Sequence, residues 1–345
     1  MTTDKLNPTR LNPRAWLYPT PRGLYCEPGD FYVDPAVAVN RAVITHGHGD
    51  HARPGHKNAL ATPETLAIMR ARFQDMPDTR QQPLKYGESL RIGDVDVGLV
   101  PAGHILGSAQ VVLEHRGQRI VVSGDYKRRP DATCLPFEPV PCDVFITEAT
   151  FALPVFHHPS DAGEIGKLLQ SLRTFPESTH LVGVYALGKC QRVITLLRAA
   201  GYDKRIWLHG SLAALCRLYQ EQGIDLGDIA LVSDAILETF KGAIVLCPPS
   251  AIADRWSRRF NEPIAAMASG WMSVRARARQ RGAELPLIIS DHADWSELTQ
   301  TLKDVGAPKV WVTHGREEAL VHYAHSIGID AEALHLSGRE EEEGE

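Results

Sequence analysis

The sequence predicts an α/β protein of two domains, and two of its features carry that prediction. Short segments with the composition of β-strands dominate residues 20–150, whereas helix and strand patterns alternate along the rest of the chain. Such alternation is typical of a parallel sheet whose strands are joined through helices. With 345 residues the chain can bury one large core or two ordinary ones. The change of pattern near residues 160–175 is the expected boundary.

The first part of the chain is expected to form mainly strands. Apolar and β-branched residues gather in six short segments, namely residues 31–35, 41–45, 89–102, 109–115, 118–125 and 143–150. One helix interrupts these strands. Thr62 can cap its first turn, Pro63 suits the first helical position, and the segment ETLAIMRARF continues it.

The second part of the chain is expected to alternate between helices and strands. Asp161 and Glu164 have the spacing of a capping box and predict a helix that ends near Arg173. Beyond it, the expected strands are residues 180–186, 205–209, 285–290 and 308–314. The expected helices are residues 188–201, 211–223, 295–306 and 316–328.

The composition argues against several classes of protein. Six cysteines are scattered without a CxxC pair, and the N-terminus lacks the apolar stretch of a signal peptide. Neither a disulfide framework nor secretion is therefore expected, and the reducing cytoplasm is the expected location. No apolar run approaches the roughly 18 residues of a membrane span, so no membrane partner is expected.

The charges are unevenly distributed along the chain. The formal net charge of −5 argues mildly against a polyanionic partner, because surfaces that bind nucleic acid are usually basic. However, five glutamates lie in the tail 338–345, which is expected to be disordered, and basic residues gather in 126–130, 255–260 and 275–281. Each basic run could equally be a solvated helix face, so charge alone leaves nucleic-acid binding open.

The stretch ITHGHGDH contains the densest group of candidate metal ligands. Alternate residues at the end of a strand point to one side, so His46 and His48 can face one ion. Asp50 and His51 follow and could serve a second ion. Imidazole nitrogens and carboxylate oxygens, without cysteine, suit zinc, manganese or iron better than calcium.

Further donors are expected at the ends of two other strands. His104 follows the strand that ends in VGLVPA, and Asp125 follows QRIVV. An aspartate in that position can bridge two ions about 3.5–4 Å apart. A single histidine is usually an ordinary polar residue, so the prediction of a metal site depends on the combination HxHxDH, GH and GD.

These residues resemble the signature of the metallo-β-lactamase fold, an αββα sandwich with its ligands on loops at one edge of two packed sheets. The resemblance implies a first metal held by His46, His48 and His104, a second held by Asp50 and His51, and Asp125 bridging them. It also matches Asp34, in FYVDP, to an aspartate that supports the histidine loop. The fold alone does not determine the substrate.

Three later segments, ITEAT, SDHAD and VTHG, resemble the further motifs of the β-CASP nucleases, represented here by Glu148, His292 and His314. By analogy His314 completes the ligands of the second metal. The resemblance covers nearly the whole chain and is greatest to the bacterial DNA-ligase-associated exonucleases. It implies a discontinuous metallo-β-lactamase domain, residues 15–165 and 285–337, with an inserted β-CASP α/β domain, residues 166–284.

Phosphate contacts are expected from the inserted domain. The segment YALGKCQR is similar to the family's AlGRxQE segment, although it has Lys189 in place of the usual arginine and Arg192 in place of the usual glutamate. Free N–H groups at the start of the helix and a nearby cation favour an anion there. The expected nucleic-acid contacts are Gly188, Lys189, Arg192, Arg255, Arg258 and Arg259.

The resemblance implies a dinuclear metal-dependent phosphodiesterase with two zinc or manganese ions per chain. The expected activity is that of a DNA exonuclease in DNA repair, with endonuclease activity possible and single-stranded DNA favoured over RNA. A functional association with an ATP-dependent DNA ligase and a helicase is also implied. The expected catalytic residues are Asp50, Asp125, Glu148 and His292, with His292 oriented by Glu148 to stabilise the leaving oxygen.

Three alternatives are left open. The protein could be an RNA-processing β-CASP ribonuclease, a small-molecule hydrolase of the same fold such as a thioesterase or lactonase, or a non-catalytic subunit that binds nucleic acid. Activity on a small ester but not on single-stranded DNA would favour the second. The third is disfavoured because inactive members lose metal ligands, whereas every expected ligand is present here.

Overall fold

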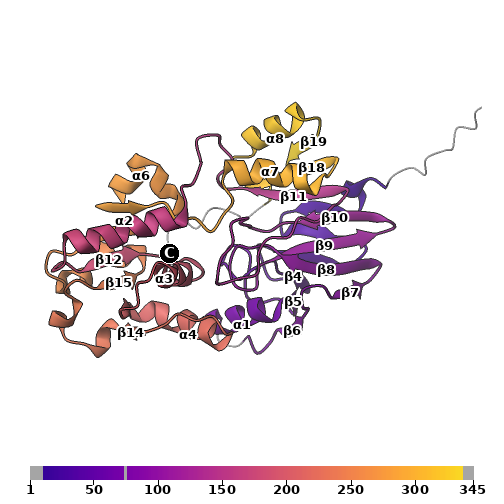
Figure 1. The fold of residues 1–345 in the computed structure, drawn as a ribbon. Coiled ribbons are helices and arrows are strands. Elements are labelled where there is room, and N and C mark those ends of the chain that lie inside the picture. The colour runs from indigo at the N-terminus through magenta and orange to yellow at the C-terminus, as the bar shows by residue number, and fades with distance from the viewer. Residues whose placement is uncertain (1–10, 74–75, 337–345) are drawn as a thin grey trace, which may run out of the picture.

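The computed structural model describes residues 11–73 and 76–336, and these form three sheets with helices packed against them (Figure 1). The predicted class is confirmed, because the fold is mixed α/β. The acidic tail predicted for residues 338–345 lies outside the described residues. None of the helices within the two described ranges is long and apolar enough to cross a membrane.

The first sheet has the strand order β1-β2-β3-β4-β5-β6. Its strands are β1 (Leu17–Thr20), β2 (Gly23–Cys26), β3 (Phe31–Val33), β4 (Arg41–Val43), β5 (Asn58–Ala61) and β6 (Arg80–Pro83). Helix α1 (Pro63–Arg72) joins the last two strands, and the Thr62 hydroxyl accepts a hydrogen bond from the Thr65 N–H at 3.1 Å. This is the N-terminal cap that the sequence predicts.

The second sheet has the strand order β19-β18-β11-β10-β9-β8-β7. Its strands are β7 (Ser89–Ile92), β8 (Val95–Pro101), β9 (Ala109–His115), β10 (Gln118–Val122), β11 (Val144–Ala149), β18 (Lys309–Gly315) and β19 (Asp330–Ala333). The strands β7 to β10 are antiparallel, whereas β10, β11, β18 and β19 are parallel neighbours. Strand β18 therefore pairs with β11, and β19 pairs with β18, although both lie far from β11 in sequence.

The first two sheets pack face to face. Apolar side chains of the first sheet, such as Phe31 and Leu60, share a buried cluster with Val97 and Ile146 of the second. Helices α7 (Trp295–Val305) and α8 (Glu317–Ser326) cover the other face of the second sheet, and α1 covers the other face of the first. The alternating burial along β8 is the pattern expected of a strand with one face in such a core.

The third sheet is entirely parallel, with the order β14-β13-β15-β12-β16-β17. Its strands are β12 (His180–Gly183), β13 (Ile206–Leu208), β14 (Ile229–Leu231), β15 (Ile244–Cys247), β16 (Ile264–Ala268) and β17 (Leu285–Leu287). The associated helices are α2 (Asp161–Thr174), α3 (Lys189–Ala199), α4 (Ala213–Glu221), α5 (Pro249–Ile252) and α6 (Arg275–Gln280). This sheet confirms the parallel arrangement predicted from alternation.

Short 3₁₀ turns complete the described structure. They are η1 (Pro13–Ala15), η2 (Gly210–Leu212), η3 (Val232–Asp234), η4 (Leu237–Phe240), η5 (Ser257–Arg259) and η6 (Gly270–Ser273).

The predicted cap of α2 is wrong. The helix is capped by Ser160, whose hydroxyl accepts a hydrogen bond from the Gly163 N–H, and not by Asp161. The Glu164 carboxylate instead accepts from the Ile288 N–H, which ties α2 to the segment after β17.

The carboxyl edge of the third sheet faces the loops of the first two sheets. Leu187 follows β12, Pro248 follows β15 and Trp271 follows β16, and all three line one cavity together with Asp125 and His314. Ligands of parallel α/β sheets typically bind beyond the carboxyl ends of the strands. The cavity therefore lies where the two parts of the fold meet.

Candidate metal centre

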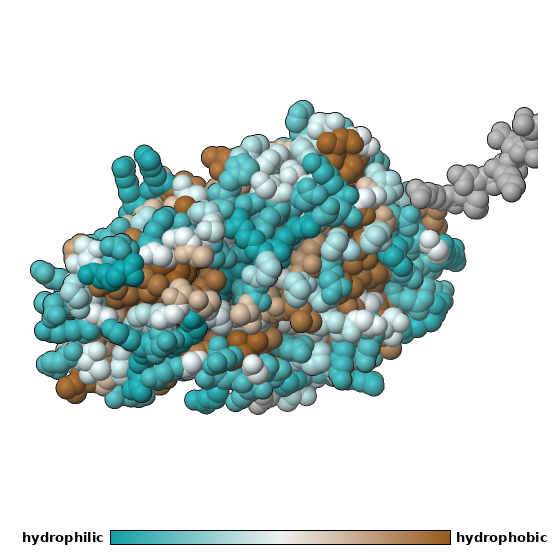
Figure 2. Space-filling model, viewed as in Figure 1, coloured by the Kyte–Doolittle hydropathy of each residue, from teal (hydrophilic) through white to brown (hydrophobic). Residues whose placement is uncertain are grey.

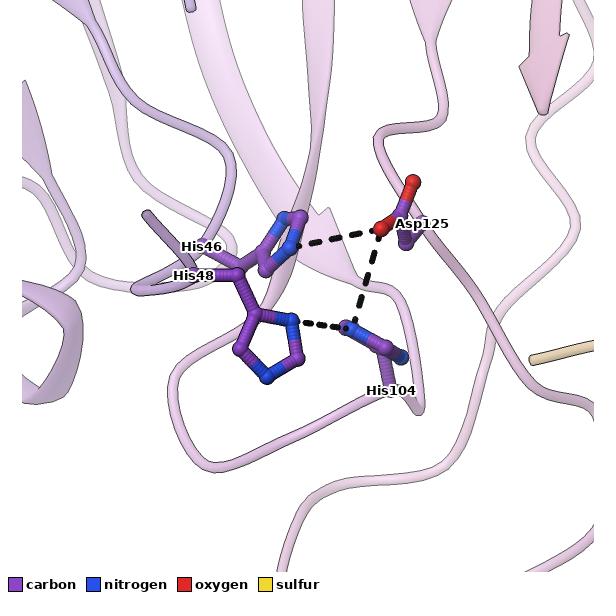
Figure 3. A group of neighbouring side chains, drawn as sticks. All are labelled: His46, His48, His104 and Asp125. Atoms are coloured by element: carbon purple, nitrogen blue, oxygen red, sulfur yellow. Dashed lines mark hydrogen bonds and ion pairs between the residues drawn. The ribbon is translucent and has the colours of Figure 1, made fainter. Parts of the chain in front are cut away.

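Three loops bring the first group of donors together. His46 and His48 follow β4, His104 follows β8, and Asp125 follows β10 (Figure 3). The His104 Nε2 lies 2.9 Å from the His48 Nδ1, and the His46 Nε2 lies 3.5 Å from the Asp125 Oδ2. The four side chains thus direct nitrogen or oxygen atoms at a common point.

The opposite nitrogens of these rings are engaged elsewhere in the protein. The His46 Nδ1 lies 3.0 Å from the Thr45 hydroxyl, and the His104 Nδ1 lies 2.9 Å from the main-chain oxygen of Asp291. The His48 Nε2 contacts the main-chain oxygen of Leu187 at 3.3 Å. Such contacts orient each ring so that its remaining nitrogen is available to an ion.

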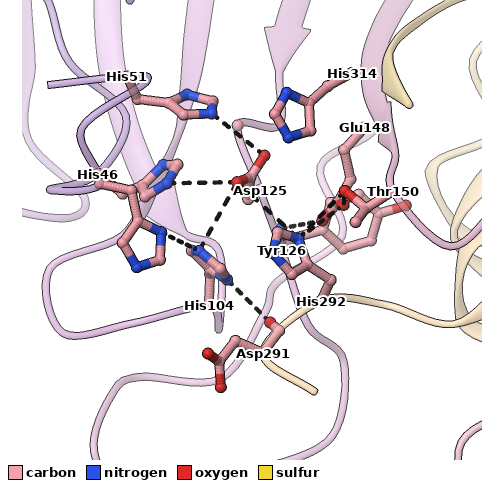
Figure 4. Close-up of polar contacts among 12 residues, drawn as sticks. His46, His51, His104, Asp125, Tyr126, Glu148, Thr150, Asp291, His292 and His314 are labelled. Atoms are coloured by element: carbon pink, nitrogen blue, oxygen red, sulfur yellow. Dashed lines mark hydrogen bonds and ion pairs between the residues drawn. The ribbon is translucent and has the colours of Figure 1, made fainter. Parts of the chain in front are cut away.

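A second group consists of Asp50, His51 and His314. Figure 4 shows its two histidines beside Asp125 of the first group. The His51 Nε2 is 3.3 Å from the Asp50 Oδ2, and the His314 Nε2 is 4.0 Å from that same oxygen. The Asp125 Oδ1 lies 3.5 Å from the His51 Nε2, whereas its Oδ2 faces His46. The two oxygens of Asp125 therefore face different groups.

Asp34 holds the histidine loop in place from behind. Its Oδ1 accepts from the Thr45 N–H at 2.8 Å, and its Oδ2 accepts from the Thr45 hydroxyl at 2.7 Å. The same Oδ2 lies 2.8 Å from the His51 Nδ1. Asp34 has a positive φ of 44°, an uncommon conformation that the surrounding hydrogen bonds must maintain.

A bulge in β18 directs His314 toward the site. Thr147 pairs with Val312, but Ala149 pairs with Gly315, so β18 carries one extra residue. His314 itself has a positive φ of 60°. Gly315, at φ 130°, is required next to it, because a Cβ there would lie 2.3 Å from the Ala149 main-chain oxygen.

The site fits divalent metal ions. The His46 Nε2, the His51 Nε2 and the Asp125 Oδ1 are buried, and none has a hydrogen-bond partner among the described residues. Leaving such atoms unsatisfied costs stability, and a bound cation would satisfy them. Separations of 3.3–3.5 Å between donors match the distance of about 3.3 Å between two ligands of a tetrahedral ion.

The protonation states of His46, His104 and Asp125 favour metal binding. Burial, assisted by neighbouring histidines, holds the pKa of His46 and of His104 well below the ordinary value. Burial would raise the pKa of Asp125, but His51 and His314 outweigh it and lower that pKa. Neutral imidazoles and an ionised carboxylate are the forms that ligate metals.

Glu148 and His292 form a separate pair beside Asp125. The Glu148 Oε2 lies 3.0 Å from the His292 Nδ1, and the same carboxylate accepts from the Thr150 hydroxyl at 2.6 Å and from the Tyr126 N–H at 2.7 Å. Burial opposes the charged form of His292, yet Glu148 raises the pKa of His292 to about 9. The His292 side chain remains 21% exposed and lines the cavity.

The structure does not support the phosphate contacts expected at the start of α3. The Arg192 guanidinium is buried and pairs with Asp131 at 2.6 Å and with Asp291 at 2.9 Å. The Lys189 ammonium is also buried, 2.9 Å from Asp291. These charges are compensated inside the protein, so the expectation that Arg192 holds a phosphate is wrong.

Gly188 serves packing and not anion binding. Its N–H donates to the Gln191 side-chain oxygen at 2.9 Å, so that group is already used. Its φ is 85°, and a Cβ would lie 2.4 Å from the Ile105 methyl group. Glycine is therefore required for α3 to approach the loop that carries His104.

The predicted run of arginines 255–259 lies apart from the cavity. Arg255, Arg258 and Arg259 are exposed on the segment after α5, and none of them lines the cavity. Arg259 lies over the Trp256 ring at 5.3 Å from its centroid. These arginines are thus accessible, but the structure does not bring them to the donor groups.

The apolar wall of the site could not be predicted from the sequence. Phe151, Tyr185 and Trp271 line the cavity of about 280 Å³, and Arg72 also lines it. The Trp271 ring contacts that of Phe151 with 4.7 Å between centroids. The segment ASGWM was visible in the sequence, but its place at the carboxyl end of β16 was not.

Comparisons with known proteins give relatives but no matching family model. A probable DNA ligase from Opitutus terrae is 28% identical over 320 residues, which cover 90% of this chain and 30% of that protein. A ribonuclease from Thermus thermophilus is 23% identical over 376 residues, which cover 87% of this chain and 86% of that protein. The chain thus spans under a third of the first relative and most of the second.

A solved structure shares the fold. The crystal structure of a protein of unknown function from Enterococcus faecalis V583 matches with a TM-score of 0.58, covering 87% of this chain and 80% of that one. At 12% identity this match concerns the fold alone. The sequence relatives, in contrast, confirm the resemblance drawn from the motifs: the chain is a homologue of the β-CASP nucleases of the metallo-β-lactamase fold.

Proposed function

We propose that the protein is a dinuclear metal-dependent phosphodiesterase that hydrolyses nucleic acid, and specifically a single-strand DNA exonuclease of DNA repair. One observation carries the proposal. The two oxygens of Asp125 face two different donor groups, and the Glu148–His292 pair adjoins the same aspartate. Two cations bridged by a carboxylate, with an acid nearby, are the usual apparatus for displacement at phosphorus.

The proposal includes a fold, namely the metallo-β-lactamase αββα sandwich interrupted by a β-CASP domain. All strands of the third sheet come from residues 180–287, and β18 and β19 then return to the second sheet. This supports a discontinuous first domain, proposed as residues 15–165 and 285–337, and an inserted domain, proposed as residues 166–284, although β17 (Leu285–Leu287) of the third sheet extends past the second boundary.

His46, His48 and His104 would hold one ion, Asp50, His51 and His314 would hold the other, and Asp125 would contact both. When bound, two zinc or manganese ions would neutralise charge on the phosphate and lower the pKa of water. The protein itself keeps His46, His48 and His104 neutral by burial and holds the loop through Asp34.

His292 is the proposed general acid. Its Nδ1 is occupied by the Glu148 carboxylate, which leaves the Nε2 as the proton donor toward the cavity. Glu148 favours the imidazolium and is itself fixed by Thr150 and Tyr126. Protonating the departing 3′ oxygen is what a poor alkoxide leaving group requires.

The choice of polymer is supported by different relatives. Similarity to a protein named a probable DNA ligase supports DNA as substrate and a functional association with a DNA ligase, whereas the proposed association with a helicase depends on family resemblance alone. Similarity to a ribonuclease over most of its length supports the second candidate, an RNA-processing ribonuclease. Arg255, Arg258 and Arg259 are exposed and accessible to the phosphates of either DNA or RNA.

The test is a time course on end-labelled single-stranded DNA and RNA of one sequence. Metal-stripped protein would be supplied with zinc, manganese or magnesium, and the products resolved by length. We expect manganese- or zinc-dependent release of mononucleotides from DNA from the earliest time points. Cleavage of RNA alone would support the ribonuclease, and internal fragments would indicate an endonuclease. Hydrolysis of small esters with neither polymer cut would refute the proposal.

A further inference from the structure

The segment 263–283 contains four arginines and no acidic residue, and the proposed function does not use it. It comprises β16, the turn η6 and the short helix α6. The run 255–259 differs, because an acidic residue, Asp254, directly precedes it. The Asp254 carboxylate accepts a hydrogen bond from the Arg255 N–H at 2.6 Å. The segment is therefore rich in positive charge, although Glu262 and Glu284 flank it.

This segment is continuous with the wall of the cavity. Arg277 of α6 lies over the Trp271 ring at 3.8 Å from its centroid, and Trp271 lines the cavity. Trp271 also contacts Phe151, whose ring lies 6.2 Å from that of His292. Three successive ring contacts thus connect α6 with the proposed general acid.

The outer face of α6 carries the other charges. Ala278 is buried with Met267 and Met272 and fixes the inner face of the helix. Arg275 and Arg279 lie one turn apart on one face of the helix, beside Ala278, and both are exposed. Within the ranges that the structure describes, neither side chain makes a hydrogen bond or ion pair. Hydrophilic side chains project from the surface over α6 in Figure 2.

We propose that Arg275 and Arg279 bind consecutive phosphates of a single nucleic-acid strand immediately outside the cavity. The proposal rests on the proposed function and adds the path of the strand. Residues four apart on a helix have Cβ atoms about 5–6 Å apart, which is comparable to the separation of neighbouring phosphates along one strand. Arg277 takes no phosphate in this arrangement, because its guanidinium lies on Trp271 and holds the wall that the strand passes.

The test is the salt dependence of binding to a fluorescent phosphorothioate oligodeoxythymidylate, which resists hydrolysis. The variants are Arg275→Gln with Arg279→Gln, and Arg275→Lys with Arg279→Lys. Each phosphate contact to a single strand contributes about 0.7 to the slope of log affinity against log salt. We expect the glutamine pair to lower that slope by about 1.4 and the lysine pair to retain it, since lysine keeps the charge.

The matched control is Arg91→Gln with Arg116→Gln. Both residues are exposed and lie at hairpins of the second sheet, at the end opposite His104 and Asp125. The control should leave the slope, and the hydrolysis of bis-p-nitrophenyl phosphate, unchanged. An equal effect of the control pair and the α6 glutamine pair, or an unchanged slope in the latter with its thermal unfolding intact, would overturn the proposal.

The same assay separates this proposal from the proposed function. If the wild-type protein hydrolyses phosphodiesters but the α6 substitutions leave strand binding unchanged, only the proposed path of the strand is refuted. A protein that binds the strand through α6 but hydrolyses no phosphodiester would refute only the enzyme. Tighter binding of the glutamine pair would place the strand elsewhere and also refute the path.

Discussion

His292 and His314 both follow strands near the end of the chain, yet their surroundings differ. His314 lies beside Asp50 and His51, whereas His292 is bound to the Glu148 carboxylate. His292→Ala should therefore retain its metal and cleave DNA about 10²–10⁴-fold more slowly, which is the usual contribution of a general acid. The measurement is single-turnover cleavage together with elemental analysis.

The loss in His292→Ala should shrink on bis-p-nitrophenyl phosphate, because its phenolate departs without a proton. His314→Ala serves as the matched control, and it should lose metal and slow both substrates alike. Equal losses of His292→Ala on the two substrates, or loss of an ion from it, would exclude the acid role.

His158 is a buried histidine that takes no part in the site. Burial lowers the pKa of His158 to about 4, and its Nε2 has no hydrogen-bond partner among the described residues. The unfolded chain then binds a proton that the folded chain does not, below about pH 6.5. The folded state therefore keeps its full stability above pH 6.5. As the pH falls from 6.5 toward 4, protonation of His158 in the unfolded chain lowers the free energy of unfolding.

His158→Phe removes this titration and keeps a ring against Phe151, which His158 contacts edge-on at 4.6 Å. Between pH 7 and pH 5 the variant should lose about 2 kcal/mol less stability than the wild type does. Urea unfolding of the metal-free proteins at both pH values measures this difference. A difference that does not change with pH would contradict the assigned cause.

At the scale of elements, α3 is fastened to the metal loops through buried ion pairs. The Asp291 carboxylate forms ion pairs with Lys189 and Arg192 of α3. The main-chain oxygen of Asp291 contacts the His104 Nδ1. Asp291→Asn leaves buried cations undercompensated and should lower the free energy of unfolding by about 3–5 kcal/mol. The affinity for metal should fall as well, because the loop beside His104 loosens.

The matched control is Asp228→Asn, which breaks an exposed pair with Arg205. Such pairs contribute under about 1 kcal/mol, so urea unfolding should barely change in that variant. A phosphate-binding role for Lys189 and Arg192 would give the opposite pattern, with strand affinity lost and stability intact. Urea unfolding and anisotropy on the same proteins distinguish these roles.

The donors of the site could be predicted because their positions depend on local patterns. His46, His48, His104 and Asp125 each follow a strand that the sequence shows, and strand ends at one sheet edge converge. The role of Arg192 could not be predicted, because its partners Asp131 and Asp291 come from distant segments. A charge at a helix start indicates an anion only when no such partner exists.

The same distinction applies to the fold. Strands with clear alternation, such as β8, were predicted, and so was α1 with its capping threonine. The strands β5, β15 and β16 were not predicted. Each is a short apolar segment without a regular alternation of apolar and polar residues, and such a segment can equally be a buried strand or part of a helix. The insertion was implied by family resemblance and not by the residues themselves.

At the scale of the whole molecule, the metal site forms only when segments that are far apart in the sequence fold next to one another. Elemental analysis should find two ions per chain in the active protein, since seven donors from four segments of the chain exceed the four ligands of one tetrahedral ion. Asp125→Ala should reduce both, because its two oxygens face both groups. One ion in fully active protein, unchanged in Asp125→Ala, would contradict the dinuclear site.

The distribution of charge over the molecule should matter more than its total. With a net charge of −5, strand binding should still weaken steeply with salt, because phosphates interact with local arginines and release counterions. Replacing Arg255, Arg258 and Arg259 by glutamine should lower the salt slope by up to about 2, at about 0.7 per phosphate contact. Anisotropy over a range of salt concentrations measures the slope.

The acidic tail provides the complementary test of this principle. Deleting residues 339–345 removes five glutamates and one arginine, so the net charge becomes less negative without any change in the described part of the chain. Repulsion between the tail and a strand falls, and cleavage should stay constant or rise modestly, most visibly at low salt where screening is weak. The deletion should leave metal content unchanged. Salt-independent strand binding, or a deletion that abolishes cleavage, would show that charge at a distance does not govern access to the site.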